Sequence, residues 1–310
     1  MLANGVQNHH HHHHHNHNHN HNHNHTTSTL TETSVVPPCL EQLPDPEPQC
    51  SPENDAQPPP PPLSAVAADL HSRVQSFLAE SHPPDSLLAR VQEQTRISLS
   101  VIERALAQYK ISELSLSYNG GKDCLVLLIL FLAGLHPLPS PAEGGISTIP
   151  AIYALPPDPF QLVEDFVRSS SRTYHLSLTR YTTEPPKTTL RSAFASYLAL
   201  NPNVKAIFVG TRRTDPHGAK LTHFDRTDQG WPDFMRIHPV IDWHYAEIWA
   251  FIRRLGIEYC SLYDEGFTSL GGTSNTHPNP KLKMPNGGGD QHYRPAYELM
   301  DDEEERLGRH

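Results

Sequence analysis

Between residues 114 and 210, short apolar runs alternate with helix-like segments, and this alternation constrains the fold more than any other feature of the sequence. Runs typical of strands cover residues 114–118, 149–155, 176–181 and 206–210. Helical segments between them cover residues 122–135, 159–171 and 188–200. A β-α-β-α order of this kind predicts an α/β fold, with a parallel sheet flanked by helices on both faces. Ligands bind such sheets at the carboxyl ends of the strands, so functional motifs should follow the strands directly.

Two further helices are expected ahead of this pattern. The first is short and covers residues 69–79. The second begins after Pro84-Asp85-Ser86, where Ser86 is a suitable N-cap, and continues to about Tyr109. Its apolar residues recur at spacings of three and four, which predicts one buried face.

The first 64 residues differ from the rest of the chain. They contain a run of seven histidines, an alternating Asn-His segment that continues to His25, and a proline run from Pro58 to Pro62. This segment has too few apolar residues to offset the entropy of ordering its backbone. We therefore expect residues 1–64 to be disordered and residues 65–310 to form one domain. The histidines are typical of low complexity or of a purification tag, although imidazoles could also bind a metal.

Composition excludes several classes of function. The formal charge of −10 argues against a nucleic-acid partner. No apolar run reaches the roughly 20 residues that a membrane span needs. The four cysteines form no metal-binding or CxxC spacing, and no secretory signal precedes them, so we expect reduced thiols in a cytoplasmic protein. The sequence does not determine the oligomeric state, and a monomer is the expectation.

The most informative motif lies where the first strand meets the first helix of the alternation. It consists of Ser117, Tyr118, Asn119, Gly120, Gly121, Lys122 and Asp123. The two glycines allow a tight turn, and the free N–H groups at the helix start favour a phosphate. The motif is not a Walker A loop, because Asp123 stands where that loop has Ser or Thr. A carboxylate there can instead hold the Mg²⁺ that bridges phosphates. The alternative is a glycine-rich turn without function.

A second motif follows the fourth strand and a third lies about ten residues further on. Gly210, Arg212 and Asp215 would place a guanidinium and a carboxylate at the same sheet edge as the first motif. Beyond them, a rigid Trp231 could stack on a flat ring that Asp228 and Arg236 contact. The alternatives are a solvated turn for the second motif and an ordinary core aromatic for Trp231.

The remaining candidates are a thiol and the end of the chain. Cys260 is more typical of a small buried residue than of a catalytic thiol. The acidic run at residues 301–305 is typical of a solvated helix end. If the terminus is helical, Arg306 and Arg309 share one face and could grip an anion, although spacing alone favours a frayed end.

Together these motifs resemble the eukaryotic FAD synthases of the PP-loop, or PAPS reductase-like, type over most of residues 115–309. The resemblance implies a Rossmann-like fold of the adenine nucleotide alpha-hydrolase kind, and transfer of AMP from ATP to the phosphate of FMN. It implies that Asn119 and Asp123 serve the ATP phosphates and Mg²⁺, that Asp215 lies at the catalytic centre, and that Asp228, Trp231 and Arg236 meet the flavin. It also implies that Arg306 and Arg309 grip phosphate, which outweighs the expectation of a frayed end.

Two other interpretations stay open at this point. The chain could be another PP-loop enzyme, such as a sulfonucleotide reductase or an RNA-modifying adenylating enzyme. It could also be a sensor that binds a flavin or nucleotide without turnover. The lack of a recognisable catalytic thiol and the acidic charge count against the first, and the intact motif residues count against the second.

Overall fold

The computed structural model describes residues 59–285 and 292–310. The expectation of disorder in the histidine-rich segment and up to Pro58 concerns residues outside these ranges. Helix α1 spans Leu63–Leu78, so it begins six residues before the expected start at residue 69. The expected start was wrong because Leu63 and Ala67 continue the apolar face of Leu70, Val74 and Phe77, and all five are buried.

Helix α2 spans Leu87–Gln108, close to the expected bounds. The Ser86 side chain accepts a hydrogen bond from the Ala89 backbone N–H at 3.2 Å, which confirms the predicted N-cap. Ser98 lies on the buried face of α2, donates to the Pro239 carbonyl at 2.7 Å, and accepts from the Trp243 indole at 2.9 Å. These two hydrogen bonds join α2 to the segment just before α6 (Tyr245–Arg254), and α2 also packs against α6 itself.

The predicted parallel sheet is present, with its four expected strands at the expected places. These are β1 (Leu114–Ser117), β2 (Ile149–Leu155), β3 (Leu176–Thr182) and β4 (Ala206–Phe208). Two strands were not foreseen, β5 (Phe224–Arg226) and β6 (Met235–Ile237), because each is three residues long, includes a charged residue and forms no apolar run. The order is β3-β2-β1-β4-β6-β5, and β5 is antiparallel to β6.

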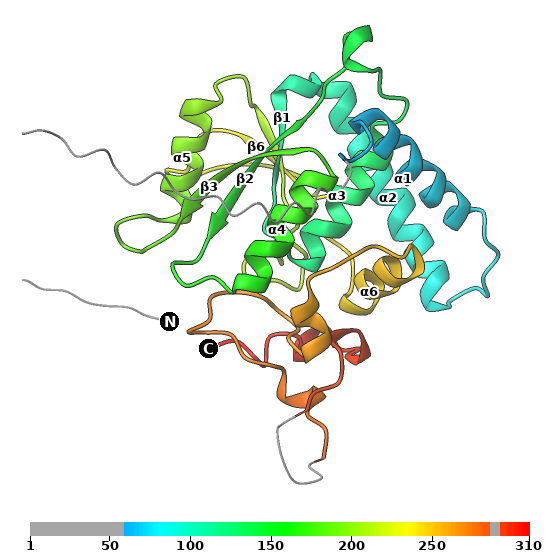
Figure 1. Ribbon diagram of the computed structural model, residues 1–310, viewed down its shortest axis with the longest axis vertical. Helices are drawn as coiled ribbons and strands as arrows, with labels where there is room; N and C mark the ends of the chain where they lie inside the picture. The colour runs from blue at the N-terminus through cyan, green and yellow to red at the C-terminus, as the bar shows by residue number, and fades with distance from the viewer. Residues whose placement is uncertain (1–58, 286–291) are drawn as a thin grey trace, which may run out of the picture. The chain divides into compact units, whose positions relative to one another are not determined.

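Helices cover both faces of the sheet (Figure 1). Helices α3 (Lys122–Gly134) and α4 (Gln161–Thr173) share one core with α1, α2 and α6. Every residue of α3 from Leu125 to Ala133 is buried, as its apolar sequence predicts. Helix α5 (Leu190–Leu200) packs on the other face over a smaller cluster that includes Ile152 and Ile207. In the order β3-β2-β1-β4-β6-β5, the strand order reverses between β1 and β4, and a ligand crevice is expected at that point.

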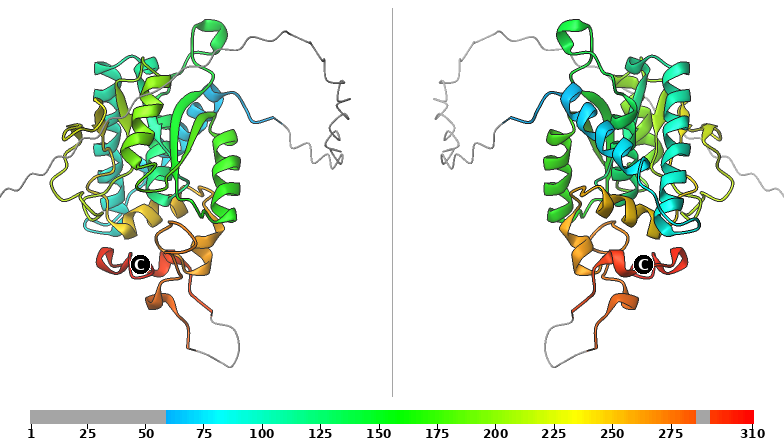
Figure 2. Two further views of the ribbon diagram at one scale, coloured as in Figure 1. Left: turned by 90° about the vertical axis from the view of Figure 1, so that its left-hand side faces the viewer. Right: turned by 90° about the vertical axis from the view of Figure 1, so that its right-hand side faces the viewer.

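In the described residues after α6, short 3-10 turns and loops replace regular helices. The turns are η3 (Ser261–Glu265), η4 (Pro280–Leu282), η5 (Ala296–Glu298) and η6 (Asp302–Glu304). In both views of Figure 2 this segment, orange to red, lies at one end of the sheet. The end of the chain is thus a turn and not the helix considered for Arg306 and Arg309. Among the described helices, none is long and apolar enough to cross a membrane.

Candidate active site

The loop after β1 is held by its own side chains. The Asn119 side-chain oxygen accepts from the Gly121 N–H at 2.9 Å and from the Cys124 thiol at 2.8 Å. The same thiol lies 3.1 Å from the Gly121 carbonyl oxygen. Burial raises the pKa of Cys124 to about 12, so the sulfur keeps its proton and can donate. Asn119 therefore shapes the loop in this structure.

Glycine is required at two positions around this loop. Gly120 has φ +73°, and a Cβ there would lie 2.7 Å from Cγ2 of Val167 on α4. Gly210 follows β4 and lies against the start of α3, where a Cβ would come within 2.8 Å of the Cys124 backbone nitrogen. The ends of β1 and β4 are thus in direct contact, as the two motifs predicted.

A cavity of about 360 Å³ opens at this junction. Its walls come from the loop after β1, the end of β2, the segment after β4 and the irregular C-terminal part of the chain. From the first and third of these it is lined by Ser117, Asn119, Gly121, Lys122, Asp123, Cys124, Val209, Gly210, Thr211, Asp215 and Pro216. The volume lies in the range of small-molecule sites, and the position is the crevice where strand order reverses.

Arg212 is at the centre of a buried ion network beside the cavity. The guanidinium is fully buried, and its Nε lies 2.8 Å from Asp123 while its Nη1 lies 3.2 Å from Asp302. Its Nη2 pairs with Glu305. Lys122, also buried, pairs with the same Glu305 and lies 3.1 Å from Asp123. Both predicted cations are therefore neutralised by protein carboxylates in this structure.

The two predicted catalytic carboxylates respond to this network in opposite ways. Burial opposes the charge on Asp123, but Arg212 and Lys122 outweigh it and lower its pKa below the ordinary value. Burial, together with the charge of Asp123, raises the pKa of Asp215. The Asp215 side chain accepts from the Arg212 backbone N–H at 2.8 Å. Both carboxylates line the cavity and they influence each other, so the site brings Asp123 and Asp215 together.

Glu305 corrects the expectation that the acidic run is a solvated helix end. Its side chain is buried between Lys122 and Arg212. Its carbonyl accepts from the Thr268 hydroxyl at 2.6 Å, and the Asn279 amide donates to the neighbouring Glu304 carbonyl at 2.8 Å. Sequence reasoning missed this residue because the ion-pair partners of its side chain, Lys122 and Arg212, lie more than 90 positions away.

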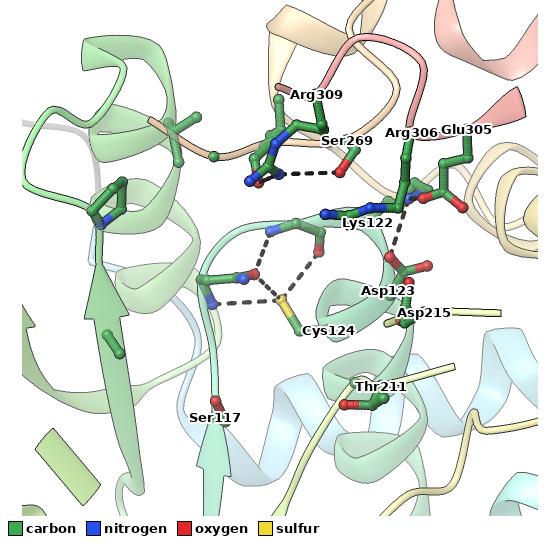
Figure 3. Close-up of a pocket in the computed structure, with 18 of the residues that line it drawn as sticks. Ser117, Lys122, Asp123, Cys124, Thr211, Asp215, Ser269, Glu305, Arg306 and Arg309 are labelled. Carbon is green, nitrogen blue, oxygen red and sulfur yellow. Dashed lines mark hydrogen bonds and ion pairs between the residues drawn. The ribbon is translucent and has the colours of Figure 1, made fainter. Parts of the chain in front are cut away.

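The two terminal arginines both line the cavity, opposite the loop after β1 (Figure 3). Arg309 donates to the Leu270 carbonyl at 2.9 Å and lies 3.3 Å from the Ser269 hydroxyl. Its Nε is buried without a hydrogen-bond partner among the described residues. Arg306 is exposed and has no polar side-chain partner in that part of the chain. Burial, together with the charge of Arg306, lowers the pKa of Arg309, so the pair would gain from an anion between them.

Other predicted residues do not line the cavity. Tyr118 is buried and its hydroxyl lies 2.8 Å from Ser170 of α4, and Gly120 and Arg212 lie behind the wall. The expected flavin contacts are on the β5–β6 hairpin. Trp231 is 37% exposed, with its ring 6.0 Å from Phe194 of α5. The flavin-binding roles of Asp228, Trp231 and Arg236, like the roles of the other site residues, stay predictions.

Two carboxylates, Asp242 and Asp264, and the thiol of Cys260 have structural surroundings. Asp242 pairs with Arg213 at 2.6 Å, and Asp264 accepts from the Tyr259 hydroxyl at 2.8 Å. Cys260 is buried, and burial raises its pKa. None of the three lines the cavity. The glycine-rich stretch after η3 does form a wall of the cavity, through Ser269, Leu270 and Gly271.

Comparison with known proteins agrees with this geometry. The model of the phosphoadenosine phosphosulfate reductase domain matches residues 113–278. A protein named probable FAD synthase from Schizosaccharomyces pombe is 40% identical over 77% of this chain and 87% of that protein. The chain belongs to the FAD synthase family. The flavin adenine dinucleotide synthase of Saccharomyces cerevisiae is 35% identical over 71% of this chain and 77% of that protein.

A solved member of the FAD synthase family has the same fold. The FMN adenylyltransferase of Candida glabrata, in complex with FMN and the ATP analogue AMPCPP, is similar with a TM-score of 0.73 and 30% identity. The match covers 80% of this chain and 97% of that one. The same enzyme has also been solved with FAD and inorganic pyrophosphate. The predicted family and the Rossmann-like, PAPS reductase-like fold are therefore confirmed.

Proposed function

We propose that this protein transfers AMP from ATP to the phosphate of FMN, giving FAD and pyrophosphate. The observation that carries the proposal is one cavity that joins the glycine loop after β1 to Asp215 and to both terminal arginines. The similar Candida glabrata enzyme supports the proposal. It is named an FMN adenylyltransferase and has been solved with FMN and an ATP analogue, and with FAD and pyrophosphate.

The reaction needs little acid–base catalysis. The nucleophile is a phosphate oxygen of FMN, which is already anionic near neutral pH, and it attacks the α-phosphorus of ATP as pyrophosphate leaves. The difficulty is to bring anions together, so the site must supply positive charge and alignment. Arg306 and Arg309 are suited to this task, because among the described cavity residues they are the cations not already paired with a carboxylate.

The donor set fits a divalent cation. In the buried network two cations face four carboxylates, namely Asp123, Asp215, Asp302 and Glu305. Oδ1 of Asp123 is buried and has no hydrogen bond, although Arg212 is near it. Mg²⁺ usually takes one or two protein carboxylates together with substrate phosphates, so two carboxylates beside the cavity are enough to hold it. Asp123, with Asp215, would hold Mg²⁺, which would neutralise charge on the leaving pyrophosphate.

The flavin ring would lie toward the β5–β6 hairpin. Trp231 supports this because it is a large exposed aromatic beside α5, and Asp228 next to it is exposed as well. Arg236 is on β6, with its guanidinium 3.4 Å from the Asp225 carbonyl, and retains donors for a ligand. The phosphate of FMN would then reach the cavity from the hairpin side.

A sulfonucleotide reductase fits less well. Such an enzyme needs a reactive thiolate. Burial raises the pKa of both described cysteines, Cys124 and Cys260, and each therefore stays a protonated thiol near neutral pH. A nucleotide or flavin sensor without turnover is distinguished by the experiment below.

The test is an assay of the purified protein with FMN, ATP and Mg²⁺, in which FAD and pyrophosphate are measured together. We expect the two products in a one-to-one ratio. Asp123→Asn should lower kcat/KM by the equivalent of about 2–4 kcal/mol, the size of one lost electrostatic contact. The matched control is Asp242→Asn, which alters an exposed ion pair outside the cavity. FMN and ATP binding without FAD would support the sensor instead, and full activity in Asp123→Asn would remove Asp123 from the site.

Three further expectations belong to this proposal. We expect the protein to act on small molecules as a monomer, without a nucleic-acid partner, and to be cytoplasmic. The acidic net charge supports the second expectation, and the unpaired, buried Cys124 and Cys260 support the third. Sedimentation of the purified full chain and fluorescence imaging of a tagged copy measure them directly.

A further inference from the structure

Tyr263 lines the cavity, yet none of the motifs described above includes it. It lies in η3 and is 1% exposed. Its hydroxyl oxygen accepts a hydrogen bond from the Lys122 backbone N–H at 2.9 Å. Lys122 is the first residue of α3, so Tyr263 uses one of the free N–H groups that make a helix start attractive to phosphate.

The hydroxyl has one more hydrogen bond to make. A tyrosine O–H can donate its hydrogen while its oxygen accepts. The oxygen of Tyr263 accepts from Lys122, and no described residue of the chain accepts its hydrogen. Burial is the main cause that keeps the pKa of Tyr263 well above its ordinary value, and the negative charge of Asp123 adds to it. The group therefore stays protonated over the whole physiological range and remains a donor.

The ring cannot easily turn away from this position. It packs edge-on against Trp249 of α6, with ring centroids 5.0 Å apart, and Tyr259 lies on the same cluster at 6.4 Å. On the other side, the oxygen lies 3.7 Å from the place where a Cβ on Gly121 would stand. The hydroxyl is thus fixed beside the glycine turn, at the boundary between the aromatic cluster and the cavity.

From these contacts we infer that Tyr263 is a phosphate-binding residue, which donates its hydroxyl hydrogen to an oxygen of the triphosphate in the cavity. The inference rests on the proposed use of ATP. The Lys122 N–H donates to the Tyr263 oxygen and is not free for the ligand. The Tyr263 O–H, which is polarised by the same helix end, would donate to the ligand in its place. The donor set around the glycine loop therefore includes a side chain that lies 141 residues beyond Lys122 in the sequence.

A purely structural role predicts something different. If Tyr263 only anchors η3 to α3, removing its oxygen would lower stability and disturb the loop for every ligand alike. If it donates to phosphate, the loss should depend on whether the ligand carries phosphates. Tyr263→Phe distinguishes these roles, because it keeps the ring in the aromatic cluster and removes only the oxygen.

The experiment measures the binding of MgATP and of adenosine by calorimetry, without FMN so that no turnover occurs. Wild type is compared with Tyr263→Phe and with Tyr245→Phe. Tyr245 is a matched control, since its buried hydroxyl donates to the Ala296 carbonyl at 2.8 Å and does not line the cavity. Urea unfolding of all three proteins records the structural part of each substitution.

We expect Tyr263→Phe to weaken MgATP binding about tenfold or more, as for a hydrogen bond to a charged group, and to leave adenosine binding unchanged. Tyr245→Phe should change neither affinity. Equal weakening of MgATP and adenosine by Tyr263→Phe, or no weakening of either, would overturn the inference while leaving the proposed function intact. Failure of the wild type to bind MgATP would overturn both.

Discussion

Two facing walls of the cavity are built by different interactions. One wall consists of the ends of β1 and β4 and the start of α3. It rests on a parallel ladder, in which Leu114 pairs with Ala206, and on the buried apolar face of α3. The other wall comes from residues 261–310, which add no strand to the sheet in their described part. It rests on side chains, chiefly Glu305, Asn279 and Thr268.

The difference indicates how the site is assembled. The first wall can form from segments that pack as soon as the sheet does. The second wall forms only when Glu305 reaches Lys122 and Arg212, which belong to the first wall. Buried ion pairs gain little stability over apolar packing, but breaking one of them is costly. We therefore expect the second wall to open locally more often than the first, and its ordering to complete the active site.

The largest test of this comparison is Arg212→Met. The substitution leaves Glu305, Asp302 and Asp123 buried with less positive charge, so the free energy of unfolding should fall by about 3–5 kcal/mol. Urea denaturation at pH 7 measures it. The matched control is the next residue, Arg213→Met, which breaks an exposed pair with Asp242 and should cost at most about 1 kcal/mol. Similar losses in the two variants would contradict the view that the network joins the walls.

Much of the fold was predictable because its signals are local. Strand β2 has the bounds that its apolar run predicted, and the β1–α3 junction follows from two glycines between a strand and a helix. The β5–β6 hairpin was missed because its short strands include charged residues and form no apolar run. Helix α1 was expected too short because Leu63 and Ala67 were not counted with its apolar face.

The site was predictable on one wall and much less so on the other. Motifs next to strands named Asp123, Gly210 and Asp215, which the cavity brings together. Nothing local distinguishes Glu305 from its acidic neighbours or Tyr263 from the other tyrosines of its segment. Their positions follow from contacts across 141 residues or more, between Tyr263 and Lys122 and between Glu305 and Lys122. Resemblance to a family, and not spacing, indicated the terminal arginines.

A smaller effect should appear in Asn279→Ala. The buried Asn279 amide donates to the Thr268 hydroxyl at 2.9 Å and to the Glu304 carbonyl at 2.8 Å. Removing it deletes two hydrogen bonds, although the Thr268 hydroxyl still donates to the Glu305 carbonyl and the Glu304 carbonyl still accepts from the Leu307 N–H. The loss of two such bonds costs about 1–3 kcal/mol. We expect this loss to be local, so that hydrogen exchange speeds up at the amides of residues 305, 307 and 309 and stays slow in the middle of α3.

The control for this variant lies in the sheet half of the molecule. The Asn201 side chain donates to the Tyr197 carbonyl at 2.9 Å at the end of α5. Asn201→Ala removes a hydrogen bond of similar kind and should leave exchange at residues 305–309 unchanged. Faster exchange throughout α3 in Asn279→Ala would mean that both walls unfold as one unit, and the comparison would fail.

The smallest expected effect is a gain in the free energy of unfolding, where the previous two variants lose it. Burial and the charge of Asp123 raise the pKa of Asp215 above its ordinary value of 3.8, so its ionised form is unfavourable in the folded protein. The unfolded chain then loses this proton at lower pH than the folded one, and stability is reduced at neutral pH. Asp215→Asn keeps an oxygen for the Arg212 N–H and removes that charge. We expect it to raise the free energy of unfolding at pH 7, by less than the losses expected for the two variants above.

The gain should shrink as the pH falls through the raised pKa of Asp215 and should vanish below the ordinary value, where wild type is protonated in both states. Unfolding curves between pH 3 and pH 7 measure this, with the exposed Asp242→Asn as control. The same variant should lose adenylyl transfer if Asp215 serves the reacting phosphates. A stabilised but inactive protein would mean that the first wall carries strain for catalysis, whereas the second wall contributes positioning. A less stable Asp215→Asn would show that the carboxylate mainly holds Arg212 in place.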